Sequence, residues 1–445
     1  MNLLYTFGIY LYGLGIQVAS RFNPKAKQWV TGRKGLFRKL EQALRSTDGD
    51  WQGTVWFHCA SLGEFEQGRP VMERFREFYP GYRIVLSFYS PSGYEVRKTY
   101  DGADVIFYLP LDTPANARKL TGLLKPKLVF FIKYEYWFNI LGELNKRNIP
   151  VFIISAIFHS QQPFFKWYGR WFRKQLKNIS WFFIQSEGSK QLAELLGIRQ
   201  FTITGDTRFD RVWMIREQRM PFPAIEKFAE NATVFLGGST WEPDETLILS
   251  LIRQNLPGLK YIIAPHEVHP ARIRELESRI EEAVGSWQLA VGSPRSPVTS
   301  HRSQILRYSA LTPENAASAT VLIIDTIGIL AHLYQVASFS MIGGGFGVGI
   351  HNILEAAAFG NPVMFGPNYR KFTEARELIE AGGAFCVKTP DDLEQVISTL
   401  LHDPDTYSRV SSICKNYVKN GRGATQRILH GIQNLDFIAP AAVKG

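Results

Sequence analysis

Short apolar runs without polar alternation recur along the first half of the chain, separated by longer amphipathic segments. They are rich in β-branched and aromatic residues, and they begin at residues 54, 83, 104, 127, 151 and 181. Such runs are typical of parallel strands that are covered by helices on both faces. The first half therefore reads as an α/β domain.

The same rhythm restarts after the Pro-containing stretch at 220–223. The later apolar runs begin at residues 233, 261, 321, 339 and 362. Two such series predict two Rossmann-like domains that face each other across a central cleft at the carboxyl ends of their strands. We expect an apolar N-terminal segment at 1–22, a first domain at 23–218, a second at 219–425, and a helical tail at 426–445 that returns to the first domain.

The segment from Asn2 to Ala19 carries no charge, and its length is close to the ~20 residues that a membrane-spanning helix needs. A basic cluster follows it rather than precedes it, which favours an uncleaved anchor that keeps the rest of the chain in the cytoplasm. The alternative is a helix that packs its Leu and Tyr side chains on the first domain or on a partner. The cluster consists of Lys25, Lys27, Arg33, Lys34, Arg38 and Lys39.

Composition adds a preference for anionic partners. The 445 residues include 51 Lys and Arg against 40 Asp and Glu, a net charge of +11. Such an excess suits phosphorylated substrates, nucleic acid or an anionic membrane leaflet. The three cysteines have no CxxC spacing, so neither a disulfide framework nor a cysteine zinc site is expected, and a reducing compartment fits best.

Two carboxylates follow strands in the first half. Glu64 lies in His58-Cys-Ala-Ser-Leu-Gly-Glu64, where the first strand gives way to a probable helix, and Glu135 follows the apolar run at 127–132. A carboxylate at a sheet edge can accept a proton from a sugar hydroxyl, and the amides of a helix start limit the rise of its pKa. The alternatives are an ordinary helix-start carboxylate for Glu64 and a loop-ordering acid for Glu135.

Two loops of the second half could hold a phosphate or a ribose. Gly238, Ser239 and Thr240 follow a strand and precede a helix, so their amides and hydroxyls could cradle a phosphate, although glycine turns are common after any strand. The glycine-rich loop from Gly343 opens a helix that carries Glu355, and this is the strongest nucleotide signal in the chain.

Neither of two superficial metal motifs fits a metal site. His266-Glu-Val-His269 has its histidines three residues apart and is flanked by prolines, unlike the zinc helix of metalloproteases. Asp48-Gly-Asp50 precedes the first strand and reads as a turn. We expect no metal.

Taken together, the chain resembles the 3-deoxy-D-manno-octulosonic acid (Kdo) transferases of lipopolysaccharide synthesis, over nearly its whole length. The segments that carry the resemblance are Met1-Asn-Leu-Leu-Tyr5, Ser61-Leu-Gly-Glu64, Ser90-Pro-Ser-Gly93, Glu135-Tyr-Trp-Phe-Asn139, Gln185-Ser-Glu187, Thr204-Gly-Asp-Thr-Arg-Phe-Asp210, Gly238-Ser-Thr240, His269-Pro-Ala-Arg272, Asp325-Thr-Ile-Gly328 and His351-Asn-Ile-Leu-Glu355.

The resemblance implies a GT-B fold and an inverting, metal-independent transfer of Kdo from CMP-Kdo to a lipid A precursor, lipid IVA. It implies no cofactor, since CMP-Kdo is a substrate, and no nucleic acid partner. The expected location is the cytoplasmic face of the inner membrane, in contact with its lipid. No particular oligomeric state is predicted.

The resemblance also assigns roles to residues. Glu64 becomes the general base, with Glu135 as a second catalytic carboxylate. Acceptor binding falls to Ser61, Gly63 and Arg208. Donor binding falls to Gly238, Ser239, Thr240, His269, Arg272, Asp325, Thr326, Gly328, His351, Asn352 and Glu355. The chain departs from the family pattern at Lys133, Tyr134, Phe138, Ile329 and the stretch His266-Glu-Val.

Two alternatives stay open at this point. Another GT-B protein, such as a different nucleotide-sugar transferase or a non-hydrolysing epimerase, would share the fold but would not need the apolar N-terminus. A catalytically silent lipid-binding scaffold would not need Glu64.

Overall fold

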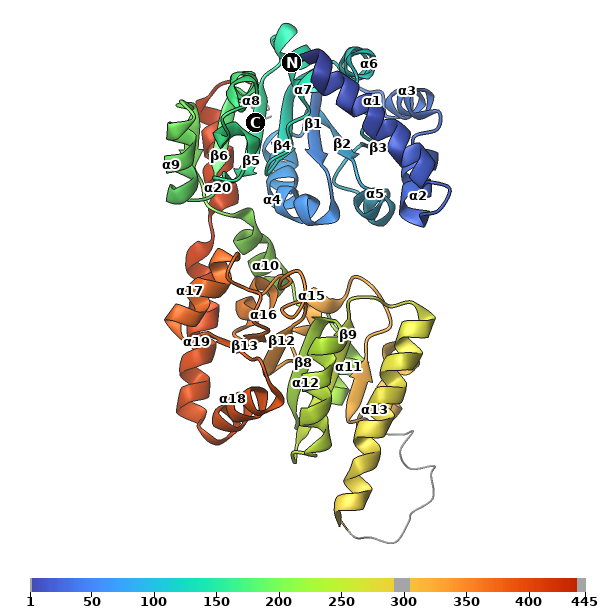
Figure 1. Ribbon diagram of the computed structural model, residues 1–445, viewed down its shortest axis with the longest axis vertical. Helices are drawn as coiled ribbons and strands as arrows, with labels where there is room; N and C mark the ends of the chain where they lie inside the picture. Colours follow the sequence, from blue (N-terminus) through green and yellow to red (C-terminus); the bar gives the residue numbers. More distant parts are fainter. Residues whose placement is uncertain (1, 292–304, 438–445) are drawn as a thin grey trace. The chain divides into compact units, whose positions relative to one another are not determined.

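A computed structural model describes residues 2–291 and 305–437 (Figure 1). The chain forms two compact units, Met1–Arg211 with Gly421–Gly445, and Val212–Asn420. The chain passes from the first unit to the second within the helix α10 (Thr207–Glu217), and it returns at the end of α19 (Pro404–Gly421). The first passage therefore lies inside a continuous helix, whereas the second lies at the end of α19, just before the Gly421-Arg422-Gly423 turn that leads into α20. We expected the first boundary at 218/219 and the second at 425/426.

The first unit is built on a seven-stranded sheet in the order β3-β2-β1-β4-β5-β6-β7. All six neighbouring pairs are parallel. The strand order reverses between β1 and β4, and ligands of doubly wound sheets bind at such a switch point. The strands are β1 (Gly53–Cys59), β2 (Tyr82–Phe88), β3 (Val105–Tyr108), β4 (Pro126–Ile132), β5 (Val151–Ala156), β6 (Trp181–Ile184) and β7 (Phe201–Ile203).

Helices cover both faces of this sheet, which explains the unbroken apolar runs of its strands. In β1, Val55 and Phe57 belong to one buried cluster with residues of α4, whereas Trp56 belongs to the cluster on the opposite face, as the period of two in a strand requires. The helices of this unit are α1 (Asn2–Ala19), α2 (Pro24–Gly32), α3 (Leu36–Ser46), α4 (Leu62–Phe78), α5 (Pro91–Arg97), α6 (Pro114–Leu124), α7 (Phe138–Lys146), α8 (Arg170–Leu176), α9 (Glu187–Leu195) and α20 (Ala424–Asn434).

The C-terminal helix α20 lies in the first unit. Its Ile428 and Ile432 are fully buried in the cluster formed with β1 and α4. Asp210 accepts hydrogen bonds from the backbone N–H groups of Gly423 (2.6 Å) and Thr425 (2.7 Å) at the start of this helix. The last eight residues of the predicted tail, 438–445, lie outside the described residues.

The N-terminal helix α1 packs on its unit along one face and is exposed over the rest of its surface. Gly13 is its only buried residue among those described, and Leu3, Leu4 and Phe7 are 85%, 67% and 61% exposed. Tyr5 ties one face of the helix to the domain, because its hydroxyl donates to Asp112 across 2.7 Å. Within residues 2–291 and 305–437, no helix is long and apolar enough to cross a membrane.

The second unit repeats the architecture, with a parallel sheet in the order β10-β11-β9-β8-β12-β13-β14. Its switch point lies between β8 and β12. The strands are β8 (Thr233–Thr240), β9 (Leu259–Pro265), β10 (Ile305–Arg307), β11 (Val321–Ile323), β12 (Phe339–Ile342), β13 (Val363–Phe365) and β14 (Ala384–Cys386). The helices are α11 (Pro223–Ala229), α12 (Glu242–Arg253), α13 (Pro270–Val291), α14 (Pro313–Ala316), α15 (Leu330–Leu333), α16 (Leu354–Phe359), α17 (Thr373–Ala381) and α18 (Pro390–His402), followed by α19.

Candidate active site

In the first unit, Glu64 lies in the first turn of α4, directly after β1. Its side chain is 8% exposed, and one carboxylate oxygen accepts a hydrogen bond of 2.6 Å from the backbone N–H of Ala60. Ser61 caps the helix, since its hydroxyl accepts from the N–H of Glu64 at 3.4 Å. A Cβ added to Gly63 would meet no atom within 4 Å apart from those of its chain neighbours, so open space adjoins Gly63.

Glu135 follows β4, the strand next to β1, and its charge acts on Glu64. Burial is the largest influence on Glu64 and repulsion by Glu135 the next, and together they raise the pKa of Glu64 to about 8. The Ala60 N–H and the charge of Lys133 act in the opposite direction. The carboxylate pair that the sequence placed at two strand ends is therefore one electrostatic unit.

A buried histidine stands beside Glu135. His58, at 0% exposure, places Nε2 3.6 Å from a Glu135 oxygen. The indole N–H of Trp137 donates to the same Nε2 at 3.0 Å, and Nδ1 lies 2.8 Å from the Ser87 hydroxyl. His58 and Trp137 were not among the predicted site residues. Both lie within the motifs that carry the resemblance or directly before them, which is the signal that could have found them.

The loop after β2 supports the Glu64 loop. The N–H of Ser90 donates to the carbonyl of Ala60 at 2.7 Å. A Cβ at Gly93 would lie 2.5 Å from the Phe88 ring and 3.2 Å from the Leu62 nitrogen, so only glycine allows this approach. The motif at 90–93 therefore packs the loop that holds Glu64.

Arg208, predicted to bind the acceptor, is oriented by its own loop. Its Nε donates to Asp206 at 2.8 Å, and Nη2 of Arg208 lies 2.7 Å from the same carboxylate. Asp210 of the same motif caps α20, as described above. Within this motif, Asp206 and Asp210 therefore have structural roles, since Asp206 orients Arg208 and Asp210 caps α20.

In the second unit, the glycine-rich loop after β12 packs against the loop after β8. A Cβ at Gly343 would lie 2.2 Å from the carbonyl oxygen of Ser239, and one at Gly345 would lie 2.4 Å from the Gly366 nitrogen. The N–H of Gly344 donates to the buried carboxylate of Asp244 at 2.9 Å. Close packing of three strand-end loops explains these glycines independently of any ligand.

Thr240 and Arg272 are brought together by a residue that the sequence did not single out, Glu245. The Thr240 hydroxyl donates to one Glu245 oxygen at 3.2 Å. The other oxygen accepts from Arg272 and, at 3.1 Å, from Arg279. Glu245 is fully buried. In the sequence, Glu245 lies one turn into the helix that follows Gly238-Ser239-Thr240, and this position could have marked it as a partner of that loop.

Three rings stack at the same sheet edge. His266 lies between Trp241 and His351, with ring centroids 4.6 Å apart in both pairs. Burial and the neighbouring His266 lower the pKa of His351 to about 4, so this imidazole is neutral at pH 7. His351 was predicted; Trp241 and His266 were not assigned a role.

The remaining predicted donor residues lie in loops after β9, β11 and β12. Ser309 donates to Asp325 through its N–H (3.0 Å) and its hydroxyl, and Gly328 has a φ of +97°. Asn352 donates to Glu355 at 3.0 Å and accepts from the N–H of Leu354, which orders the start of α16. His269 accepts from the N–H of Arg272 at 3.2 Å, and Thr326 is exposed.

All eleven predicted donor residues thus lie at the carboxyl edge of one sheet. Among the residues that the structure describes, no group of three His, Cys, Asp or Glu side chains is arranged to hold a metal ion.

The comparisons with known proteins agree with the motifs. The family described as 3-deoxy-D-manno-octulosonic-acid transferase matches residues 29–211. The chain is 26% identical over 387 residues to the Haemophilus influenzae 3-deoxy-D-manno-octulosonic acid transferase, covering 84% of this chain and 85% of that protein. It is also 26% identical to the Chlamydophila psittaci transferase, covering 85% and 84%. The predicted resemblance to the Kdo transferases is confirmed. The coarser assignment of the chain as a glycosyltransferase is confirmed with it.

The same fold occurs in an enzyme with another activity. The UDP-GlcNAc 2-epimerase of Neisseria meningitidis, solved with UDP-GlcNAc, superposes with a TM-score of 0.59 at 17% identity, covering 86% of this chain and all of the epimerase. At this identity the likeness concerns the fold alone. It confirms the predicted fold class of two Rossmann-like domains.

Proposed function

We propose that this Kdo-transferase-like chain moves Kdo from CMP-Kdo to a lipid A precursor with inversion, and that Glu64 is the general base. The observation that carries the proposal is the buried Glu64 carboxylate beside Glu135, at the switch point of the first sheet. A group of this kind can take a proton from a sugar hydroxyl.

In the proposed step, the acceptor hydroxyl loses its proton to Glu64 as its oxygen attacks the anomeric carbon of Kdo. The bond between that carbon and the phosphate oxygen breaks, and CMP leaves with the electron pair. The raised pKa of Glu64 makes its carboxylate a stronger base than an exposed glutamate, provided that it is ionised before the acceptor hydroxyl arrives. The Ala60 N–H and Lys133 favour that ionised form.

Acceptor contacts are proposed for Ser61, Gly63 and Arg208. The open space beside Gly63 leaves room for a sugar next to the base. Asp206 orients the Arg208 guanidinium through Nε and Nη2, and a guanidinium suits a phosphate on the acceptor. Glu135 is proposed to hold Glu64 at a high pKa rather than to exchange protons itself.

Donor binding is proposed for the strand-end loops of the second unit. The backbone and hydroxyls of Gly238, Ser239 and Thr240 would meet the phosphate, and Arg272 would add positive charge. The loop-helix from His351 to Glu355 would hold the ribose. The proposed step uses no metal, since amides and cations of these loops meet the charge of the leaving CMP. The proposed location is the cytoplasmic face of the inner membrane, reached through α1.

The test compares Glu64→Gln with Glu187→Gln. Glu187 is also a first-turn glutamate, at the start of α9, but it is exposed. We expect Glu64→Gln to lower kcat of Kdo transfer to a tetraacylated lipid A precursor by about 10²–10⁴, while CMP binding measured by calorimetry stays within about twofold. Glu187→Gln should match the wild type in both. Wild-type transfer by Glu64→Gln would contradict the base assignment, and loss of CMP binding would show that the substitution acts on the fold.

The fold likeness to an epimerase gives the second candidate, a UDP-sugar epimerase. The same preparations should therefore be assayed for conversion of UDP-GlcNAc. We expect no conversion, and Glu64-dependent conversion would replace the transferase proposal.

A further inference from the structure

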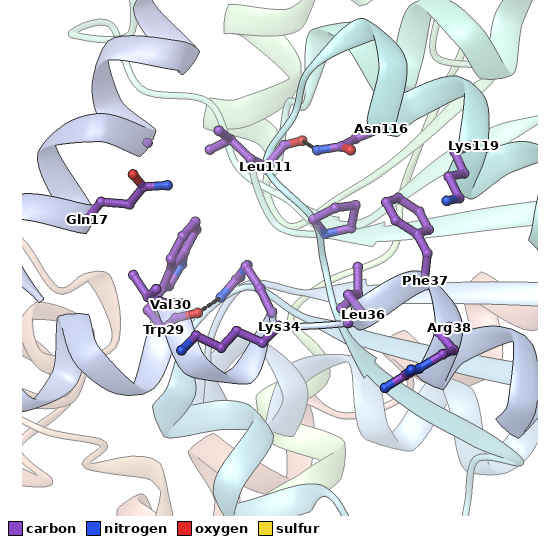
Figure 2. Close-up of a pocket in the computed structure, with 14 residues that line it drawn as sticks. Gln17, Trp29, Val30, Lys34, Leu36, Phe37, Arg38, Leu111, Asn116 and Lys119 are labelled. Atoms are coloured by element: carbon purple, nitrogen blue, oxygen red, sulfur yellow. Dashed lines mark hydrogen bonds between the residues drawn. The ribbon is translucent and has the colours of Figure 1, made fainter.

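A cavity of about 680 Å³ lies in the first unit, between the N-terminal helices and the loop that leads into α6 (Figure 2). Its wall combines apolar side chains with cations. The lining residues include Trp29, Val30, Leu36, Phe37, Pro110 and Leu111. Neither Glu64 nor Glu135 lines it, so it is separate from the candidate active site.

The charge of this cavity has one sign. Arg33, Lys34, Arg38 and Lys119 line it, and no carboxylate does. Within the described residues, none of the four forms an ion pair. Arg33 is stacked 3.7 Å above the Trp29 ring, and its guanidinium donates only to backbone carbonyls, those of Trp29, Tyr89 and Leu109. Burial lowers its pKa to about 10, so it remains charged at pH 7.

The remaining cations lie around the rim. Lys34 and Arg38 are exposed, and the Lys119 ammonium lies 4.7 Å from the Phe37 ring. In Figure 2, Lys34, Arg38 and Lys119 lie around the apolar side chains of Leu36 and Phe37. An apolar floor with unpaired cations above it matches an amphiphile that carries an anionic head on an alkyl chain.

The cavity continues onto the exposed apolar helix α1. Gly13 and Gln17 of α1 form one wall, and a Cβ at Gly13 would lie 2.6 Å from Leu111, so the helix is seated closely here. Further along α1, Leu11 and Leu14 are 52% and 58% exposed. Exposed leucines beside a cationic cavity favour a bilayer as the source of the amphiphile.

We propose that this cavity, lined by Arg33, Lys34, Arg38 and Lys119, binds the phosphate headgroup and upper acyl chain of an anionic bilayer phospholipid. The site would hold the protein on the membrane in a defined orientation. Its occupant is a bulk lipid of the leaflet rather than the sugar acceptor, because the cavity is not lined by the carboxylates proposed for catalysis.

The first experiment is vesicle binding by the full chain, measured by sedimentation. The vesicles contain phosphatidylcholine alone or mixed with phosphatidylglycerol. The variant Lys34→Ala/Arg38→Ala removes two rim cations, one in the turn between α2 and α3 and one in α3. The matched control Lys25→Ala/Lys39→Ala removes two exposed cations of α2 and α3 that do not line the cavity. If the positive charges acted only through long-range attraction to the anionic membrane, both double variants would lose vesicle affinity equally, by about fivefold per charge removed.

We expect the rim double to bind anionic vesicles about tenfold more weakly than the control double, because it also loses direct phosphate hydrogen bonds. Equal losses would overturn the proposal. Thermal unfolding of both doubles checks the fold, and cross-linking of the wild type by a photoreactive phosphatidylglycerol should label residues 29–38 or 110–119. Labelling confined to other segments would also overturn it.

Two further arms separate the possible ligands. A short-chain phosphatidylglycerol below its critical micelle concentration should compete with vesicles for the protein. Inorganic phosphate at the same concentration should not compete. Equal competition by phosphate would show that the cavity binds anions without recognising a lipid, and would overturn the proposal. In detergent micelles without phospholipid, the rim double should keep the wild-type KM for the lipid A precursor. A raised KM would assign the cavity to the acceptor and contradict the proposal.

Discussion

The indole N–H of Trp137 donates to Nε2 of His58 across 3.0 Å, and this bond orients a buried histidine beside Glu135. An indole N–H can only donate, so Nε2 is the acceptor of this bond. The other ring nitrogen, Nδ1, faces the hydroxyl and carbonyl of Ser87. The imidazole is therefore held on both sides, with Nε2 3.6 Å from a Glu135 oxygen.

Replacing Trp137 by Phe should release that constraint. The imidazole of His58 would lose one of its two anchors and could rotate away from Glu135. We expect kcat of Kdo transfer to fall and the free energy of unfolding to fall by about 1 kcal/mol. Trp51→Phe is the control, since its indole N–H donates instead to a backbone carbonyl, that of Thr47, and it should lose stability without a change in kcat. An unchanged kcat in Trp137→Phe would refute this role for the bond.

The wild-type enzyme should show the pKa of Glu64 in its activity. Because the base must be ionised, kcat/KM should rise with pH up to about 8 and then level off. A plateau that begins near pH 5 would show that Glu64 has an ordinary pKa or that another group is the base.

The free energy of unfolding of the first unit should fall as pH rises, whereas kcat/KM should rise. The folded protein holds a proton on Glu64 between pH 4.5 and about 8, where the unfolded chain has lost it, so the free energy of unfolding falls as pH rises through this window. Glu64→Gln cannot ionise, and we expect it to be more stable than the wild type at pH 8 by about 4 kcal/mol. Urea unfolding at pH 5 and pH 8 measures this difference, which should vanish at the lower pH.

Lys133 should tune the same carboxylate. Its charge lowers the pKa of Glu64, and its φ of +70° fixes it directly after β4. Lys133→Met keeps the length and removes the charge, so the rise of kcat/KM should move to higher pH. Lys146→Met, an exposed lysine at the end of α7, should leave the profile unchanged. A shift of equal size in both variants would mean that net charge, not position, is responsible.

Glu245 should be essential to the order of the donor loops. It is fully buried and holds Thr240, Arg272 and Arg279. Removing one partner of a buried ion pair costs about 3–5 kcal/mol, so Glu245→Gln should markedly destabilise the second unit and weaken CMP binding. Glu275→Gln is the control, because Glu275 is 53% exposed and lies 3.5 Å from Arg272. Equal stability of the two variants would contradict the network.

Several features were predictable because their causes are local. Apolar runs predicted the longer strands of both sheets, and the position of Glu64 after the first of them predicted a carboxylate at the start of a helix. The strands β7, β10 and β14, of three residues each, were missed, whereas β11 and β13, which are equally short, were predicted from their apolar runs. The two compact units change over at 211/212 and 420/421, a few residues from the expected boundaries, and the first change lies inside α10, where the helical pattern is unbroken.

The sequence by itself determined the elements, the resemblance and the identity of the two carboxylates. Only the tertiary structure decided what surrounds them, because strand order and side-chain contacts join residues far apart in the chain. The adjacency of β1 and β4 makes Glu135 act on Glu64, and Trp137 reaches back 79 residues to donate a hydrogen bond to the imidazole of His58. Asp210 reads as a site motif in the sequence, yet its carboxylate caps α20, more than 200 residues later.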